Sequence, residues 1–193
     1  EMRWSGGRAL VRDTQKEGAG RVLHEVEVVQ GALREPFPSL ELLVSPEHRL
    51  PTQRNHTATH LLHGALRKVL GEGVRQAGSL VHPDHLRFDF TFGRPLTAEE
   101  RAAVESLVDE WVLKALDTRI TAGREFREAV AAGAVALFGE KYGERVRTVE
   151  VPGFSLELCG GCHVRNTGEI GPFVIRHERG IASGVRRIEA LTG

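Results

Sequence analysis

Residues 55–70 read NHTATHLLHGALRKVL, and the architecture of the chain can be built outward from this stretch. Its apolar side chains recur three or four residues apart, which is the spacing of one face of an α-helix. Gly71 and Gly73 follow directly and are typical of the end of a helix. We therefore expect a helix over about residues 55–70. Its apolar face comprises Ala58, Leu62, Ala65, Leu66 and Val69.

Strand patterns follow this helix towards the C-terminus. Residues 74–81 and 86–91 read as paired strands joined by the turn-rich residues 82–85. Further short strands, separated by glycine-rich turns, are expected at residues 146–151, 154–158, 173–177 and 185–191.

Two more helices are expected between these strands. Residues 97–100, Thr-Ala-Glu-Glu, resemble a capping box and predict a helix through about Asp117. An alanine-rich helix is expected near residues 125–132. Helices and strands segregated in this way predict an α+β fold, with a largely antiparallel sheet and packed helices. The broad apolar face of the helix that begins at residue 97 comprises Val104, Leu107, Val108, Trp111 and Leu113 to Leu116.

The first 50 residues have a different character. Short strands are expected near residues 9–11, 22–28 and 40–44, punctuated by glycine and proline. Pro46 and Pro51 mark a boundary near residue 50. We expect a small β-rich, partial β-barrel-like segment at 1–50, followed by a larger domain at 51–193.

Composition and charge exclude several classes of protein. The 193 residues carry 26 basic and 26 acidic side chains, which argues against a polybasic tail or an acidic disordered activator. No apolar run approaches the roughly 20 residues of a membrane span. Two cysteines this close together suit a reducing, cytoplasmic compartment.

The formal net charge of zero arises because segments of opposite net charge offset one another. Residues 51–96 carry six basic and three acidic side chains, and residues 159–193 carry five and three. Together the two segments have a formal net charge of +5, and the rest of the chain has a formal net charge of −5. This asymmetry favours these two segments as a side that faces nucleic acid.

Two histidines on the first expected helix have the spacing of metal ligands. His56 and His60 are four residues apart, so they lie one turn apart on one face, and His63 follows seven residues after His56. Imidazoles at this spacing can converge on one ion, as they do in zinc sites. Alone, the pair is a weak signal, because this spacing arises often on ordinary solvated helices.

A second pair of candidate metal ligands lies about 100 residues later, where residues 158–163 read LCGGCH. Cys159 and His163 are again four residues apart, and the two glycines would let the backbone fold tightly around an ion. With His56 and His60 they make a tetrahedral donor set, which predicts one Zn²⁺ per chain tying the helix to the sheet. A closed site would be purely structural, whereas a catalytic site needs an open or expandable position.

The same cysteine turn admits two other interpretations. Cys159, Cys162 and His163 fit the haem-attachment pattern of c-type cytochromes, and the two cysteines fit a dithiol redox site. Met2 is the only methionine, and a haem would leave the histidine pair unexplained. We therefore expect no haem, and we expect Cys162 to be a small, partly buried thiol that binds no metal.

Longer motifs around these residues resemble the alanyl-tRNA synthetase editing domain. The resemblance runs from about Asp13 to Gly193, and free-standing AlaX trans-editing proteins share the motif set. Threonyl-tRNA synthetase editing domains share a looser version. Three positions depart from the family pattern: Cys162 replaces a common Thr, and Gly73 and Phe92 replace a frequent His. The matching segments are 54–63 (RNHTATHLLH), 76–81 (QAGSLV), 87–90 (RFDF), 136–143 (ALFGEKYG), the cysteine turn and 180–190 (GIASGVRRIEA).

The resemblance implies an enzyme, a hydrolase that deacylates Ser-tRNA(Ala) and also Gly-tRNA(Ala). It implies a role for Gln76 in handling the wrong amino acid. The implied partners are the 3′ end and acceptor stem of tRNA(Ala) and, if the chain is one domain of a larger enzyme, the rest of an alanyl-tRNA synthetase. The alternative is a tRNA-binding module with a structural zinc and no remaining hydrolytic activity. The implied metal ligands are His56, His60, Cys159 and His163.

Elementary chemistry supports editing independently of the resemblance. A pocket for alanine cannot strongly reject glycine or serine, but a site that hydrogen-bonds the serine hydroxyl does reject alanine. Gln76, Thr57 or Thr59 could supply this hydrogen bond, although both threonines also suit ordinary helix surface. Zinc would either lower the pKa of a bound water or position the substrate, and four protein ligands favour positioning.

Arginines gather near the cysteine turn and could contact phosphates through their bidentate guanidinium groups. We expect Arg165, Arg186 and Arg187 to bind RNA, with Arg176 and Arg179 nearby. The alternative is a solvated strand face on which these arginines pair with Glu178 and Glu189.

Overall fold

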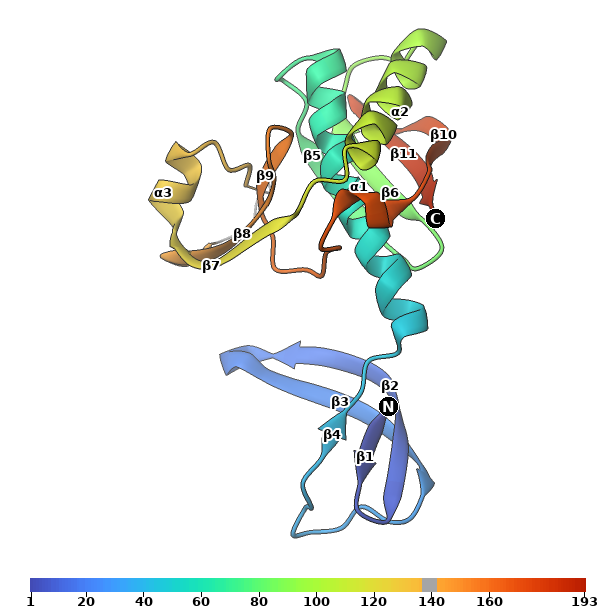
Figure 1. Ribbon diagram of the computed structural model, residues 1–193, viewed down its shortest axis with the longest axis vertical. Coiled ribbons are helices and arrows are strands. Elements are labelled where there is room, and N and C mark those ends of the chain that lie inside the picture. Colours follow the sequence, from blue (N-terminus) through green and yellow to red (C-terminus); the bar gives the residue numbers. More distant parts are fainter. Residues whose placement is uncertain (137–141) are drawn as a thin grey trace. The chain divides into compact units, whose positions relative to one another are not determined.

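The computed structural model describes residues 1–136 and 142–193 (Figure 1). These residues form two compact units, Glu1–Arg49 and Leu50–Gly193. Most of the motif at residues 136–143 falls on residues 137–141, which lie outside the described residues. Among the described residues, no helix has the length and apolar character needed to cross a membrane.

The first unit contains an antiparallel sheet with the strand order β3-β2-β1-β4. The β-rich N-terminal segment is therefore confirmed. β2 and β3 extend beyond the expected strands because their cross-strand pairing continues through polar residues, from Arg8 opposite Gln30 to Glu17 opposite Arg21. The strands are β1 (Met2–Trp4), β2 (Gly7–Glu17), β3 (Arg21–Gln30) and β4 (Glu41–Leu42), with a 3-10 turn at Gly18–Gly20.

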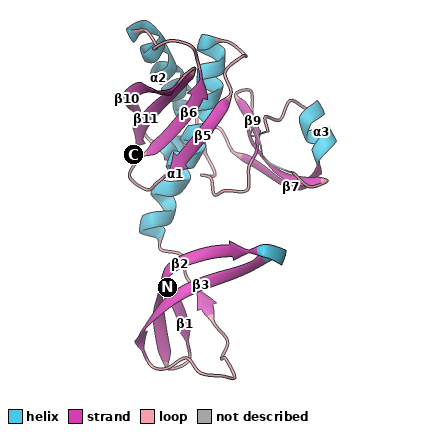
Figure 2. Cartoon of the chain, turned by 180° about the vertical axis from the view of Figure 1, so that it is seen from behind, coloured by secondary structure: helices cyan, strands magenta, loops and turns pink. Residues whose placement is uncertain are grey.

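The second unit is built on a four-stranded antiparallel sheet with the order β10-β11-β6-β5. The opposite views of Figures 1 and 2 show that α1 (Pro46–Leu70) and α2 (Ala98–Leu113) lie on one face of this sheet. Leu62, Phe88 and Val108 are fully buried between these layers. This arrangement confirms the α+β fold. The sheet strands are β5 (Gln76–Val81), β6 (Leu86–Thr91), β10 (Phe173–Ala182) and β11 (Val185–Thr192).

Helix α1 begins at Pro46, earlier than the expected residue 55. Proline is well suited to the first position of a helix because its missing N–H has no partner there in any case. The backbone N–H groups of His48 and Arg49 donate to the carbonyl of Ser45, which starts the helix. Pro51 is accommodated inside it.

Asn55 fixes α1 against the sheet. Its side chain is buried, and its Nδ2 donates to the carbonyl oxygens of His82 at 2.7 Å and Pro83 at 3.0 Å, in the β5–β6 turn. The hydroxyl of Thr192, at the end of β11, donates to Asn55 Oδ1 at 2.9 Å. One side chain therefore sets the position of the histidine-bearing face of α1 relative to the β5–β6 turn and the end of β11.

Helix α2 has the predicted capping box, with reciprocal bonds between Thr97 and Glu100, but it ends at Leu113 and not near Asp117. The hydroxyl of Thr167 donates to the carbonyl of Trp111 and accepts from the N–H of Leu116, both at 2.9 Å, which terminates the helix. Leu113 is 83% exposed, so the prediction that it belongs to the apolar face was wrong.

A second antiparallel sheet in this unit has the order β7-β8-β9, with α3 (Phe126–Ala131) after its first strand. The short helix near residues 125–132 is therefore confirmed. β7 was not predicted because its side chains are almost all exposed and show no alternation; pairing with β8 holds it. The strands are β7 (Arg119–Glu125), β8 (Arg145–Val151) and β9 (Ser155–Leu158), followed by a 3-10 turn at Thr167–Ile170.

Candidate metal centre

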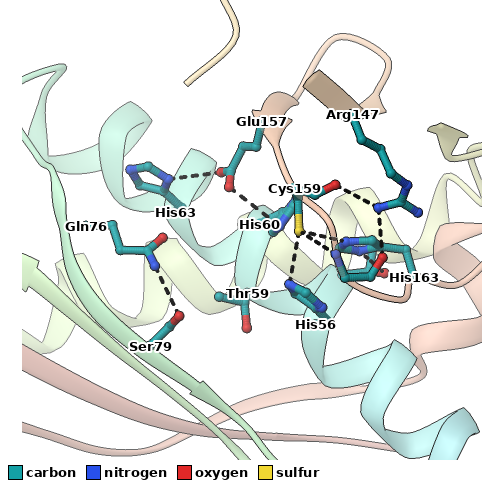
Figure 3. Close-up of polar contacts among 12 residues, drawn as sticks. His56, Thr59, His60, His63, Gln76, Ser79, Arg147, Glu157, Cys159 and His163 are labelled. Atoms are coloured by element: carbon teal, nitrogen blue, oxygen red, sulfur yellow. Dashed lines mark hydrogen bonds and ion pairs between the residues drawn. The ribbon is translucent and has the colours of Figure 1, made fainter. Parts of the chain in front are cut away.

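Four side chains from two distant segments converge beside the end of β9 (Figure 3). His56 and His60 come from α1, and Cys159 and His163 come from the turn that follows β9. Their donor atoms all lie within 4.8 Å of one another. The Sγ atom of Cys159 lies 3.3 Å from Nε2 of His56 and 3.3 Å from Nε2 of His163.

Two of these separations match the spacing of ligands in a tetrahedral metal site. Ligands at about 2.0–2.3 Å from a zinc ion lie roughly 3.3–3.7 Å from one another. Both sulfur–nitrogen distances fall in this range. Nδ1 of the buried His60 also has no hydrogen-bond partner among the described residues, so it is free to bind an ion. The four residues could therefore hold one metal ion.

The turn is shaped so that the imidazole of His56 can approach it. A Cβ atom at Gly161 would overlap the ring of His56, so any other residue at this position would force that ring to move. The backbone N–H of Gly161 donates to Cys159 Sγ at 3.4 Å. Arg147 Nη1 donates to the carbonyls of Cys159 at 2.7 Å and Gly161 at 2.8 Å, which holds the turn closed.

Thr57 contacts the imidazole of His163 and is fully buried. Its hydroxyl donates to the carbonyl of Gln53 at 3.0 Å, accepts from the N–H of Val164 at 3.2 Å, and lies 3.2 Å from His163 Nδ1. A hydroxyl offers one donor and two acceptor positions, and all three are engaged. In this geometry Thr57 orients His163 and has no hydrogen-bonding capacity left for a substrate.

We expect Thr57→Val to weaken metal binding about 10- to 100-fold, because groups that orient a metal ligand contribute this much. Valine keeps the shape of the side chain but leaves His163 Nδ1 and the N–H of Val164 unpaired. Competition with a metal-sensitive chelating dye measures the change. Thr59→Val is the matched control, since the Thr59 hydroxyl donates only to the carbonyl of Asn55. Equal metal affinity in the two variants would contradict the assignment of Thr57.

Glu157 couples the centre to His63 and was missed by the sequence analysis. Its Oε2 lies 3.6 Å from Nε2 of His60, and its Oε1 accepts from Nδ1 of His63 at 3.0 Å. Carboxylates in this position commonly orient a ligating histidine. An acidic residue two positions before the candidate cysteine was the available signal, but only the tertiary structure shows that it is buried and which histidines it contacts.

Burial sets the protonation state of the centre. Burial, and next the charge of His60, lower the pKa of His56 to about 4. Burial also lowers the pKa of His60 and of His163, so all three imidazoles are neutral at pH 7, the form that binds metal. Burial raises the pKa of the Cys159 thiol, so its thiolate needs a nearby cation.

Glu157 remains ionised within this buried cluster. Burial alone would raise the pKa of its carboxyl, but the positive charge that His60 and His63 carry when protonated, together with the hydrogen bond from His63, outweighs that effect and lowers the pKa below its usual value. A negative charge therefore lies beside the histidines, where it can stabilise a positive ion.

The other predicted residues are placed as follows. Gln76, on β5, is half-buried, and its Nε2 donates to Ser79 Oγ at 3.0 Å. Thr59 is buried, and its hydroxyl donates to the carbonyl of Asn55 at 2.8 Å, which leaves its acceptor positions open. Cys162 is a partly exposed thiol outside the four-residue group. Phe92, one of the departures from the family pattern, packs against the core.

Two of the three predicted RNA-binding arginines are paired with carboxylates. Arg187 donates to both oxygens of Asp89 at 2.6 and 2.7 Å, and Arg186 donates to Glu178 at 2.6 Å. Arg165 is exposed, and its side chain makes no ion pair with any part of the chain that the structure describes. The pairing of Arg186 with Glu178 is the arrangement anticipated by the solvated-face alternative.

Comparison with known proteins agrees with this site. Residues 146–189, which include Cys159 and His163, match the family described as the threonyl and alanyl tRNA synthetase second additional domain. The chain is 54% identical to an alanine–tRNA ligase of Pseudothermotoga lettingae over 190 residues, 52% identical to one of Thermotoga maritima over 192 residues, and 54% identical to one of Thermus thermophilus over 199 residues. These matches cover 98%, 100% and 100% of the chain but only 22% of each relative. The chain belongs to the alanine–tRNA ligase family and corresponds to the part that carries the second additional domain.

Proposed function

We propose that the chain hydrolyses the aminoacyl ester of Ser-tRNA(Ala) and Gly-tRNA(Ala), as the editing part of an alanyl-tRNA synthetase or as a free-standing relative. The observation that carries the proposal is the converging donor set, two of whose members, His56 and Cys159, are partly exposed. A centre that opens to the surface can be reached by a tRNA 3′ end, whereas a purely structural zinc needs no such opening. The proposal places the chain in the cytoplasm, with its tRNA.

We propose Zn²⁺ as the metal, held by His56, His60, Cys159 and His163, because one thiolate and three neutral imidazoles match its preference. When bound, zinc supplies a positive centre that polarises or orients the ester. Thr57, Arg147 and Glu157 hold the ligands in place, and this rigidity helps to position an ester that is already reactive.

Gln76 and Thr59 are proposed to recognise the serine hydroxyl. Both have hydrogen-bonding groups that the fold does not fully use, namely the carbonyl oxygen of Gln76 and the acceptor positions of Thr59. Alanine would leave such groups unpaired, so correctly charged tRNA would bind less well.

The direct test measures deacylation of Ser-tRNA(Ala) and Gly-tRNA(Ala), with Ala-tRNA(Ala) as the control substrate. We expect both mischarged tRNAs to lose their amino acid and Ala-tRNA(Ala) to persist, and we expect a chelator to stop the reaction. A chain that binds tRNA but leaves both esters intact would instead be the tRNA-binding module with a structural zinc.

Gln76→Ala separates hydroxyl recognition from general catalysis. Losing one neutral hydrogen bond should slow deacylation of Ser-tRNA(Ala) about threefold to tenfold. Glycine has no hydroxyl, so Gly-tRNA(Ala) deacylation by the same variant should not change. Single-turnover rates for the two substrates provide the measurement. An equal loss for serine and glycine would remove Gln76 from the recognition role.

Among the arginines we propose that Arg165 makes a phosphate contact, while the carboxylates beside Arg186 and Arg187 offset part of their charge. We expect Arg165→Ala to weaken tRNA binding and to lower the slope of log affinity against log salt by roughly one unit. Arg101→Ala, on α2 beside Glu105, is the control. Parallel salt dependences for Arg165→Ala and the unaltered chain would exclude this contact.

A further inference from the structure

Gln53, on α1, bonds to the backbone of the candidate ligand His163. Its Nε2 donates to the carbonyl oxygen of His163 at 2.7 Å, across 110 positions of the chain. A carbonyl oxygen only accepts, so the amide of Gln53 must present its NH₂ group here. The contact therefore fixes the orientation of the Gln53 side chain as well as the position of the carbonyl.

Gln53 shares one stripe of α1 with two of the candidate ligands. Residues 53, 56, 57 and 60 follow the three- and four-residue spacing of a helix face, and they fall within an arc of roughly 100°. His56 and His60 supply donor atoms to the centre, whereas Gln53 and Thr57 bond to the segment that carries His163. The sequence did not reveal this stripe, because α1 was expected to begin only at residue 55.

The segment that carries His163 lacks regular secondary structure. Residues 159–165 lie between β9 and the 3-10 turn at Thr167–Ile170 and belong to no helix or strand. The carbonyl of His163 accepts from Gln53, and its ring Nδ1 lies 3.2 Å from the hydroxyl of Thr57. The next backbone N–H, that of Val164, donates to the same hydroxyl at 3.2 Å. Side chains of α1 therefore hold both the backbone and the imidazole of this ligand.

We propose that Gln53 is a positioning residue of the metal centre. Its bond keeps the backbone of His163 in place while Thr57 directs the ring, so that Nε2 of His163 stays 3.3 Å from Cys159 Sγ. A ligand that is held in place before the ion arrives loses less conformational freedom on binding, which favours binding. Gln53 and Thr57 bond to different atoms, so loss of the Gln53 bond loosens the centre even when Thr57 is intact. The inference rests on the proposed function only in the choice of zinc as the ion.

Gln53→Met tests the proposal, because methionine has nearly the length of glutamine but no N–H donor. Loss of one neutral hydrogen bond should weaken zinc binding about threefold to tenfold, as measured by competition with a chelating dye. The visible absorption bands of the Co²⁺-loaded chain, which report the geometry around the ion, should change in energy or intensity. Gln53→Ala also lacks the donor, and measuring it in parallel makes the test independent of how methionine packs.

Gln15→Met, in the first unit, is the matched control. Gln15 is exposed and bonds to Asp13, so this variant should bind zinc as the unaltered chain does. Zinc affinity and a cobalt spectrum that stay unchanged in both Gln53 variants would overturn the proposal. A lower unfolding temperature of the metal-free variants would not rescue it, since that result alone would show a role in stability only.

The outcome is separable from that of the proposed function, because metal binding is measured without tRNA. A chain whose zinc affinity depends on Gln53 but that leaves Ser-tRNA(Ala) intact would refute only the proposed function. An unaltered chain that binds neither zinc nor cobalt would overturn the metal centre and the role of Gln53 together.

Discussion

Cys159→Ala is expected to weaken zinc binding by roughly 100- to 1,000-fold and to abolish deacylation of Ser-tRNA(Ala). The substitution removes the only sulfur donor of the group, the atom that lies 3.3 Å from both His56 Nε2 and His163 Nε2. Structural zinc sites bind the ion with roughly 10–16 kcal/mol, so an even share for each of four ligands is about 2.5–4 kcal/mol. That share corresponds to a loss of roughly 100- to 1,000-fold in metal affinity.

His60→Ala should have the same effect, since it removes a buried imidazole from the same set. Cys162→Ala is the matched control: it removes a thiol three residues from Cys159 that lies outside the donor group. Metal content by mass spectrometry, circular dichroism and single-turnover deacylation should be measured on the same samples. A folded Cys159→Ala or His60→Ala chain with full activity would show that the reaction does not depend on this centre.

Gly161→Ala is expected to disable the centre although no ligand is changed. The added methyl group would occupy the position of the His56 imidazole, and the backbone of the turn is held by Arg147, so the imidazole must move away. The centre then loses one of its four donors. We expect metal affinity to fall by about the same 100- to 1,000-fold as for removal of a ligand.

Gly160→Ala provides a control one residue earlier in the same turn. A Cβ at Gly160 would have no other atom within 4 Å, so this variant should retain zinc and activity. Zinc affinity by competition with a chelating dye distinguishes the two variants, and circular dichroism establishes that both are folded. If the two alanine variants bound zinc equally well, the close approach of His56 to the turn would be excluded.

The expectations that the structure confirms rest on local patterns. The alternation of residues 86–91 places Leu86, Phe88 and Phe90 in the core, and the capping box at Thr97 begins α2 as expected. The separation of four residues within each pair, His56 with His60 and Cys159 with His163, also identified the four residues that converge in space. Each of these patterns depends on neighbours within a few residues along the chain, where geometry follows directly from helix or strand periodicity.

The features that were missed depend on contacts between distant segments. β7 has no alternation and forms through its pairing with β8, and α2 stops at Leu113 because Thr167 caps it from elsewhere. The sequence could not distinguish a threonine that contacts substrate from one that supports a ligand. In the structure, the Thr57 hydroxyl uses all of its hydrogen-bonding positions, whereas acceptor positions of the Thr59 hydroxyl remain open.

The sequence by itself therefore determined the fold class, the family and the four donors of the candidate centre, because periodicity and short motifs encode them locally. Only the tertiary structure decided how those donors are supported. The contacts of Glu157 with His60 and His63, of Arg147 with the cysteine turn, and of Thr57 with His163 join residues up to 106 positions apart or bridge separate strands and turns. Such contacts leave no periodic trace in a sequence, since hydrogen bonds and packing between distant segments form only when the chain has folded.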